Sequence, residues 1–252
     1  MSDTNTAPQY SLEHCYNENF SYERIFSNPY DEKLESLFSH FVLRDNQGES
    51  YRGKWNTAFF KREDAPLHVE IGPGYGDFML NYCPSNPEIN FVAMDFRFKR
   101  SFTVAKKLSQ LPAQNFCYLR ARAERLEFLF APGEIHKLFC FFPDPWPKAR
   151  HHKKRLFNKR FFRSIHQCLK KGGEFHFKTD HAEYFPWILE QLDDFQKEGQ
   201  EESFEVLLQT ENLYETAHQS LELPFLASFQ TKFEKIFLQK EIKIKAFVLR
   251  KK

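Results

Sequence analysis

The sequence of 252 residues predicts an α/β protein with an open, mostly parallel sheet of seven strands and helices on both faces. Three observations support this fold class. Short apolar runs alternate with helical patterns from Leu67 onward, a glycine-rich turn follows the first of these runs, and Leu138 to Phe142 is apolar without interruption. An uninterrupted apolar run is typical of a central parallel strand buried on both faces, and strands separated by helices favour right-handed crossovers.

The individual elements follow from the local patterns. The predicted strands cover residues 67–71, 91–95, 115–119, 138–142, 174–178, 204–208 and 242–249. The predicted helices begin near Asp77 and cover 97–110, 159–169 and 181–195, and the third of them is stopped by Gly172 and Gly173. Because ligands bind beyond the carboxyl ends of such strands, the residues directly after each strand are the candidates for function.

Residues 1–60 lack strong periodicity and are predicted to form an N-terminal extension with one short helix near Asp31 to His40, whereas residues 61–252 form the main domain. The first ten residues are polar, so no secretory signal is expected. The longest apolar run has five residues, which is too short for a membrane span. Five scattered cysteines without a CxxC pair indicate a reducing compartment and no structural zinc. We therefore expect a cytoplasmic protein without membrane or metal partners; its oligomeric state stays open.

Charge is unevenly distributed along the chain, although the net charge is only +2. Residues 145–173 contain ten Lys or Arg and no acidic residue, whereas residues 181–222 contain eleven acidic residues and a single Lys. Residues 231–252 are basic again. A basic stretch in a nearly neutral protein suggests a surface that faces a polyanion, and a solvated helix face is the plain alternative.

The turn after the first strand reads Glu70-Ile71-Gly72-Pro73-Gly74-Tyr75-Gly76. Glycines let the backbone turn sharply and approach a ligand closely. The spacing is GxGxG rather than the GxGxxG of dinucleotide-binding folds, which favours a ligand built of methionine and adenosine over a pyrophosphate. Asp95 ends the second strand, 21 residues after Gly74, where a carboxylate can bind both ribose hydroxyls.

A proline-rich segment follows the fourth strand: Pro143-Asp144-Pro145-Trp146-Pro147. The prolines restrict the backbone on both sides of Asp144, so its carboxylate is expected to be held rigidly. Trp146 offers a flat face for a base. The residues that follow, 148–155, are a dense candidate for phosphate binding, and Asp180 places another carboxylate after the fifth strand. Asp180 could equally be only a helix cap.

Together these motifs resemble the bacterial tRNA (guanine-N7-)-methyltransferases. The resemblance rests on Glu70 to Gly74, the run Pro143 to His151, the pair Thr179-Asp180 and the late segment Thr231 to Glu234. It extends from about residue 67 to the C-terminus, and the PDPWPKxRH run is its most specific part. The resemblance implies a Rossmann-like class I methyltransferase that uses S-adenosylmethionine to form 7-methylguanosine in tRNA, at a variable-loop guanosine.

The resemblance also implies a role for each matching residue. Asp144 is the expected catalytic residue and contacts the cofactor as well. The expected cofactor-binding residues are Glu70, Gly72, Gly74, Asp95, Arg122 and Asp144. The expected substrate-binding residues are Lys148, Asp180, Thr231, Lys232, Phe233 and Glu234. The expected RNA-binding residues are Arg150, His151, His152, Lys153, Lys154 and Arg155.

Arg122 departs from the family pattern, which has an acidic or amide residue at the position that receives the adenine amino group. A guanidinium has no hydrogen-bond acceptor, so its side chain cannot take that role. Three explanations remain open: the backbone contacts adenine, Glu124 takes over the contact, or the cofactor binds more weakly.

The chemistry of guanine N7 limits what a catalytic carboxylate has to do. N7 carries an in-plane lone pair and no proton, so methylation creates a cation without prior deprotonation. Asp144 is therefore expected to orient guanine and stabilise the developing positive charge rather than act mainly as a base. Asp180 would accept hydrogen bonds from guanine N1–H and the amino group and select against adenine.

Three other functions stay in view. A class I methyltransferase acting on protein or a small molecule shares the glycine turn but leaves residues 148–155 unexplained. An RNA-binding module with a vestigial cofactor pocket is mildly favoured by Arg122. A nicotinamide dehydrogenase is disfavoured by the glycine spacing and the lack of an obvious histidine for hydride transfer.

Overall fold

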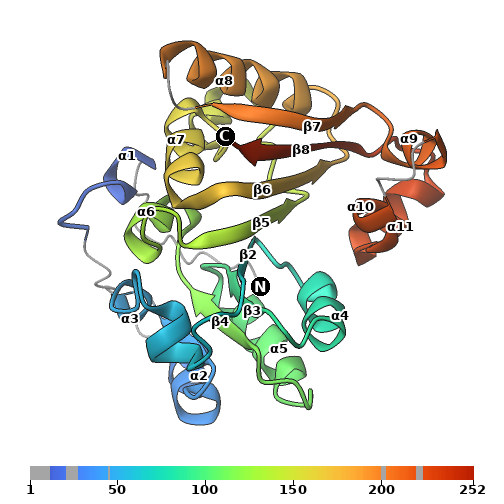
Figure 1. Ribbon diagram of the computed structural model, residues 1–252. Helices are drawn as coiled ribbons and strands as arrows, with labels where there is room; N and C mark the ends of the chain where they lie inside the picture. The colour runs from blue at the N-terminus through green and yellow to red at the C-terminus, as the bar shows by residue number, and fades with distance from the viewer. Residues whose placement is uncertain (1–11, 21–27, 45, 200–202, 220–223) are drawn as a thin grey trace.

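The computed structural model describes residues 12–20, 28–44, 46–199, 203–219 and 224–252. One eight-stranded sheet runs through the molecule in the order β1-β4-β3-β2-β5-β6-β8-β7 (Figure 1). Its strands are β1 (Val42–Arg44), β2 (Leu67–Ile71), β3 (Asn90–Met94), β4 (Phe116–Arg120), β5 (Ile135–Phe141), β6 (Leu169–Thr179), β7 (Phe204–Thr210) and β8 (Lys245–Lys251). β8 runs antiparallel to both of its neighbours, β6 and β7, and all other neighbouring strands are parallel, so the predicted α/β fold class is confirmed.

The seven predicted strands are all present, and the eighth, β1, was missed. β1 lies at the edge of the sheet, where Val42 pairs with Tyr118 of the parallel strand β4. With only three residues, it is too short for a recognisable period of two in the sequence. Tertiary contacts bury this edge: Val42 belongs to the apolar core, and Phe41, directly before β1, packs edge-on against Phe116 of β4.

Helices cover both faces of the sheet. One face packs against α6 (Leu126–Leu129), α7 (Lys159–Cys168) and α8 (Tyr184–Glu198), and the other against α2 (Pro29–Phe38), α4 (Asp77–Ser85), α5 (Phe98–Leu108) and α10 (Pro224–Ser228). The remaining helical segments are α1 (Leu12–Cys15), α3 (Asn46–Glu49), η1 (Trp55–Phe60), η2 (Ala123–Arg125), η3 (Ala149–Lys154), α9 (Leu213–Gln219) and α11 (Lys232–Gln239). Successive side chains along a strand point alternately into the apolar core on one face of the sheet and the apolar core on the other face.

Gly172 and Gly173 do not end α7, as the sequence suggested, but lie within β6. α7 ends at Cys168, and β6 starts directly afterwards. Gly172 has a positive φ of 75°, and a Cβ on Gly173 would lie 3.0 Å from the carbonyl oxygen of His136. The two glycines therefore allow an irregular close pairing with β5 rather than a helix cap.

The segment before β2 packs onto the core. Trp55 is fully buried and donates from Nε1 to the carbonyl oxygen of Leu129, at 2.8 Å. Glu134 accepts from the backbone N–H groups of Gly53 and Trp55. The predicted helix near Asp31 corresponds to α2, whose N-cap Asn28 accepts from the N–H of Tyr30.

Figure 1 shows α4 and the group α9–α11 flanking the end of the sheet toward which β5 and β6 point. This is the carboxyl edge of the parallel strands, where the fold places its ligands. Within the described part of the chain, no helix combines the length and apolar character that a bilayer span requires.

Candidate active site

The glycine turn after β2 leaves open space beside its backbone. Gly72 and Gly74 have positive φ values of 72° and 57°, and a Cβ on either would meet no atom within 4 Å. A Cβ on Gly76 would lie 2.9 Å from Val104, so this third glycine serves the packing of α4 on α5. The first two glycines thus form a cradle that a ligand can approach closely.

Glu70, at the end of β2 before this cradle, is buried with an incomplete set of hydrogen bonds. Its Oε2 has no hydrogen-bond partner among the described residues, and the side chain is 3% exposed. Burial raises the pKa of Glu70 to about 8, and the charge of Asp77 adds to this shift. A buried acceptor without a donor is costly, so a bound ligand that supplies an ammonium or hydroxyl donor would fit this position.

Asp95 follows β3 and lies beside the cradle, because β3 pairs with β2. One of its oxygens accepts from the N–H of Arg97 at 3.0 Å, and the other lies 3.4 Å from Nη1 of Arg100. Burial raises the pKa of Asp95, and the two arginines act in the opposite direction. The glycine cradle, the Glu70 carboxylate and Asp95 together suit a ligand with an amino acid part and a ribose.

The segment after β5 has a strained backbone, which the sequence analysis did not predict. Phe142 and Trp146, on either side of Pro143-Asp144-Pro145, have positive φ values of 56° and 46°. Non-glycine residues rarely adopt this conformation, and such strain concentrates at functional sites. The Asp144 carboxylate is exposed and pairs with Arg97, with 3.2 Å between Oδ2 and Nη2. Arg97 thereby joins the end of β3 to the proline segment, a link that the sequence analysis missed.

Most of the basic residues after Asp144 reach the surface. Lys148, Arg150 and Lys153 are exposed. Lys148 is the N-cap of the short 3₁₀ helix η3, which carries Arg150 and Lys153 together with the half-buried His151, His152 and Lys154. Lys154 lies with Nζ 4.9 Å from the centre of the Trp146 ring. This cluster can therefore face a large anionic partner beside Asp144.

Arg155 has a different position from the other basic residues. It is 3% exposed, its Nε donates to the carbonyl oxygen of Pro145 at 2.9 Å, and its guanidinium lies over the rings of Tyr184 and Trp187. This geometry corrects the expectation of a phosphate contact: Arg155 faces the interior and supports the proline segment.

The late segment Thr231 to Glu234 starts α11 and is fastened to α4. Thr231 and Glu234 form a capping box, and the N–H of Lys232 donates to Oδ2 of Asp77 at 2.8 Å. The ring of Phe233 lies 6.2 Å from that of Tyr75 in the glycine turn. The segment and the glycine turn thus lie side by side, although they are far apart in the sequence.

Glu234 itself points into the protein. It is fully buried, and its carboxylate accepts from Nζ of Lys178 at 2.6 Å and from the hydroxyl of Tyr214 at 2.9 Å. Lys178 also donates to the carbonyl oxygens of Leu226 and Phe229. Glu234 therefore anchors α10 and α11 to β6 and does not face a substrate in this structure.

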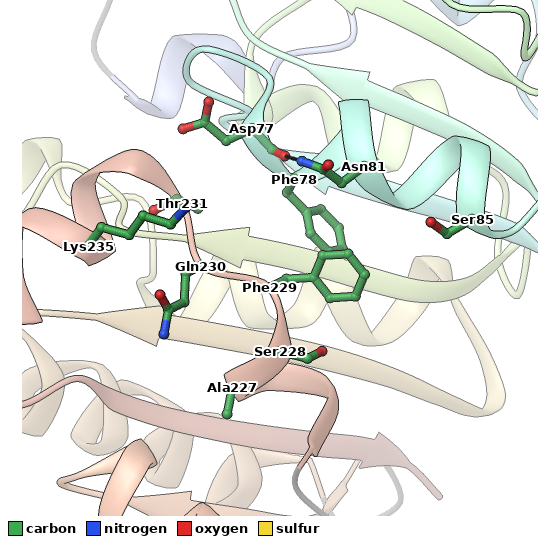
Figure 2. Close-up of a pocket in the computed structure, with 10 residues that line it drawn as sticks. All are labelled: Asp77, Phe78, Asn81, Ser85, Ala227, Ser228, Phe229, Gln230, Thr231 and Lys235. Carbon is green, nitrogen blue, oxygen red and sulfur yellow. Dashed lines mark hydrogen bonds between the residues drawn. The ribbon is translucent and has the colours of Figure 1, made fainter.

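A pocket of about 450 Å³ lies between α4 and the chain from α10 to α11, and Figure 2 shows the side chains that line it. It is lined by Asp77, Phe78, Asn81, Ser85, Ala227, Ser228, Phe229, Gln230, Thr231 and Lys235. Only Thr231 among these was a candidate from the sequence. The two sides of the pocket are joined by the hydrogen bond from the N–H of Lys232 to Asp77 and by the edge-on contact of the Phe78 and Phe229 rings, whose centres are 5.2 Å apart.

Asp180 and Arg122 follow strands of the same sheet edge, although β3, β2 and β5 lie between β4 and β6. Asp180 comes directly after β6 and is half-buried, and the next residue, His181, donates from its N–H to Oγ1 of Thr179. Arg122 comes after β4 and lies against the ring of Phe96. In the described ranges, no three His, Cys, Asp or Glu side chains gather closely enough to hold a metal ion.

Comparison with known proteins agrees with this geometry. A family model described as "Putative methyltransferase" matches residues 64–246. The tRNA (guanine-N(7)-)-methyltransferase of Bacillus subtilis is 37% identical over 145 residues, covering 58% of this chain and 67% of that protein. The protein of the same description from an Exiguobacterium species is 36% identical over 172 residues, covering 68% of this chain and 78% of that protein.

Among solved structures, the 16S rRNA methyltransferase KamB superposes with a TM-score of 0.53 at 16% identity. The match covers 77% of this chain and 93% of that chain. At this level of identity the likeness concerns the fold alone.

Proposed function

The chain belongs to the tRNA (guanine-N7-)-methyltransferase family, and we propose that it methylates N7 of a guanine in tRNA with S-adenosylmethionine as methyl donor. The observation that carries this proposal is the link from Asp95 through Arg97 to Asp144. It brings a carboxylate suited to ribose and a carboxylate held by prolines to the same edge of the sheet. The basic cluster of η3 continues from that edge.

The residues of the cradle fit S-adenosylmethionine. Gly72 and Gly74 allow its close approach, the unpartnered oxygen of Glu70 would accept from a donor in its amino acid part, and Asp95 would accept from the ribose hydroxyls. When bound, this cofactor supplies a methyl group on a positively charged sulfur, which guanine N7 accepts. S-adenosylhomocysteine is the other product.

Asp144 would act on the guanine. N7 has a lone pair and no proton, so the residue need not remove a proton before the bond forms. The exposed carboxylate can contact guanine if the base replaces Arg97 as its partner or binds beside it. Its negative charge would then stabilise the positive charge that develops on the guanine ring during methyl transfer. The strained backbone at Phe142 and Trp146 supports a fixed position for this charge, which reduces the reorganisation needed during reaction.

Asp180 and Lys148 would hold the base and its phosphate. A carboxylate after β6 can accept from guanine N1–H and the amino group together, a pair of donors that adenine does not present. Lys148 is exposed next to the proline segment, and the side chains of η3 extend the same positive surface. Contacts of Lys and Arg to phosphate position the RNA without reading its sequence.

The test is methylation of tRNA in vitro with labelled S-adenosylmethionine. We expect 7-methylguanosine on nucleoside mass spectrometry, and cleavage mapping should locate it in the variable loop, as the sequence resemblance implies. Methylation of protein or a small molecule instead of tRNA would contradict the proposal. Tight tRNA binding without binding of S-adenosylmethionine, measured by calorimetry, would favour a non-enzymatic RNA-binding module.

A further inference from the structure

Polar side chains in the pocket of Figure 2 keep hydrogen-bonding capacity that the described residues do not use. Asn81 donates from Nδ2 to the backbone carbonyl oxygen of Asp77, at 2.7 Å, so its own Oδ1 stays free to accept. The Oγ1 of Thr231 accepts from the N–H of Glu234, which leaves its hydroxyl hydrogen for another partner. Among the described residues, the ammonium of exposed Lys235 forms no ion pair or hydrogen bond. The pocket can therefore bind a polar ligand.

The two walls of the pocket offer opposite kinds of group. The wall at α11 carries donors, the ammonium of Lys235 and the hydroxyl of Thr231. The wall at α4 carries acceptors, Oδ1 of Asn81 and the carboxylate of Asp77. An anion suits the first wall and a neutral hydroxyl suits the second. A polyphosphate would bring negative charge against Asp77, whereas a ribose joined to one phosphate supplies both groups.

The pocket lies on the face of the sheet opposite to η3. Phe78, one of its lining residues, belongs to the apolar core on the face that α4 covers. η3 is followed by Arg155, whose guanidinium lies over the ring of Tyr184 in α8, and Tyr184 belongs to the core on the other face. A polyanion that crosses the carboxyl edge of the sheet can therefore contact η3 on one face and this pocket on the other.

Exposed aromatic rings adjoin the pocket on the side of the glycine turn. Tyr75 and Phe233 are 44% and 46% exposed, and Cζ of Arg100 lies 6.0 Å from the centre of the Tyr75 ring. Tyr75 lies two residues before Asp77, and Phe233 lies two residues after Thr231. Exposed rings beside cationic groups are typical of surfaces that stack unpaired bases. The surroundings of the pocket thus favour a nucleotide of an RNA chain over a free sugar phosphate.

We propose that this pocket binds the ribose and phosphate of a tRNA nucleotide close to the target guanine. Lys235 and the hydroxyl of Thr231 bind the phosphate, and Oδ1 of Asn81 accepts a hydrogen bond from the ribose 2′-hydroxyl. The RNA crosses the carboxyl edge of the sheet and is held on both faces. This inference rests on the proposed function and adds to it a contact that distinguishes RNA from DNA, because DNA lacks the 2′-hydroxyl.

Transcripts with single 2′-deoxy substitutions test the ribose contact. The substitutions are placed at the target guanosine and at the two nucleotides on either side of it, and kcat/KM for methylation is measured with each transcript. We expect at least one substitution to lower kcat/KM about three- to tenfold, the effect of one lost hydrogen bond. Values within about twofold of the unsubstituted transcript at all these positions would overturn this inference and leave the proposed function intact. Failure of the wild-type protein to methylate the unsubstituted transcript would contradict the proposed function instead.

Asn81→Ala assigns the ribose contact to one side chain. The variant lacks the acceptor, so kcat/KM for the unsubstituted transcript should fall about three- to tenfold, and the sensitive 2′-deoxy substitution should then have almost no further effect. A deoxy effect as large in Asn81→Ala as in wild type, measured on protein with a normal melting curve, would overturn the assignment.

Lys235→Met tests the phosphate contact. For tRNA binding, the magnitude of the slope of log K against log salt should decrease by somewhat less than one unit. Lys240→Met removes an exposed charge directly after the same helix and outside the pocket lining, so it is the matched control and should keep the wild-type slope. An unchanged slope in Lys235→Met would overturn the phosphate contact.

Discussion

The side chain of Asp77 accepts a hydrogen bond from the backbone N–H of Lys232, which lies 155 residues later in the chain. Asp77 is the first residue of α4, directly after the glycine turn, and Lys232 is the first residue of α11. This bond joins the part of the site expected to hold the cofactor to the segment expected to hold the substrate. The bond would thereby fix the position of the substrate-binding segment relative to the cofactor-binding turn.

Loss of this bond should affect the substrate more than the cofactor. We expect Asp77→Ala to raise KM for tRNA about tenfold, the effect of one lost hydrogen bond to a charged group, with a smaller change in S-adenosylmethionine binding. Asp77→Asn keeps an acceptor oxygen and is the control that should stay close to wild type. Equal effects of both variants would show that the charge of Asp77, and not its bond to Lys232, is what matters.

Asp144→Asn tests the role of the carboxylate directly. The amide has nearly the same shape but no negative charge, so kcat should fall at least about 100-fold if charge stabilisation is the main role. Steady-state kinetics at saturating tRNA and S-adenosylmethionine measure this change. Turnover close to that of wild type would refute the electrostatic role.

The basic cluster should contribute to tRNA binding through counterion release. Lys153→Ala should reduce the magnitude of the slope of log K against log salt by somewhat less than one unit. Arg155→Ala should change this slope less, because the guanidinium is buried against Tyr184, and should lower the melting temperature instead.

Lys171→Ala removes an exposed charge near the start of β6, at the other end of that strand from Asp180, and is the control for the salt experiment. Its slope should equal that of wild type. Slopes that are unchanged in Lys153→Ala and in the combined variant of Lys153→Ala with Lys154→Ala would place the RNA on another surface.

The ion pair of Lys178 with Glu234 should contribute to the free energy of unfolding. Lys178→Met leaves a fully buried carboxylate without its cation, which costs about 3–5 kcal/mol of stability. Changing Glu234→Gln as well removes the unpaired charge, so the double variant should be more stable than Lys178→Met alone. Denaturation in guanidinium chloride measures both, and equal stabilities would mean that the carboxylate is not isolated in the single variant.

Glu70 should make stability depend on pH. Because burial raises its pKa to about 8 from an ordinary value of 4.5, the folded protein holds this proton more tightly than the unfolded chain does. The stabilising contribution is complete below about pH 4.5 and is lost as pH rises through 8. Urea denaturation should therefore show a smaller loss of stability between pH 5 and 8 in Glu70→Gln than in wild type.

Exposed Glu88 provides the control for the pH experiment, since Glu88→Gln should keep the wild-type dependence. The same dependence in wild type and Glu70→Gln would mean that another group is responsible.

The sequence alone determined the parallel core and the positions of the main site residues. Strands with uninterrupted apolar runs, a glycine turn and a carboxylate framed by prolines are local signals, because each reflects the conformation or burial of neighbouring residues. The expected locations of Glu70 near the end of β2 and of Asp95 and Asp144 directly after β3 and β5 agree with the structure. Their functional roles stay predictions.

Only the tertiary structure decided which of the other residues face the site. The basic run did not reveal that Arg155 turns inward, and the late segment did not reveal that Glu234 is buried against Lys178. Neither did the sequence reveal that Arg97 reaches Asp144 across 47 residues. Side-chain direction at such positions depends on partners that are distant in the chain, and local periodicity carries no information about those partners.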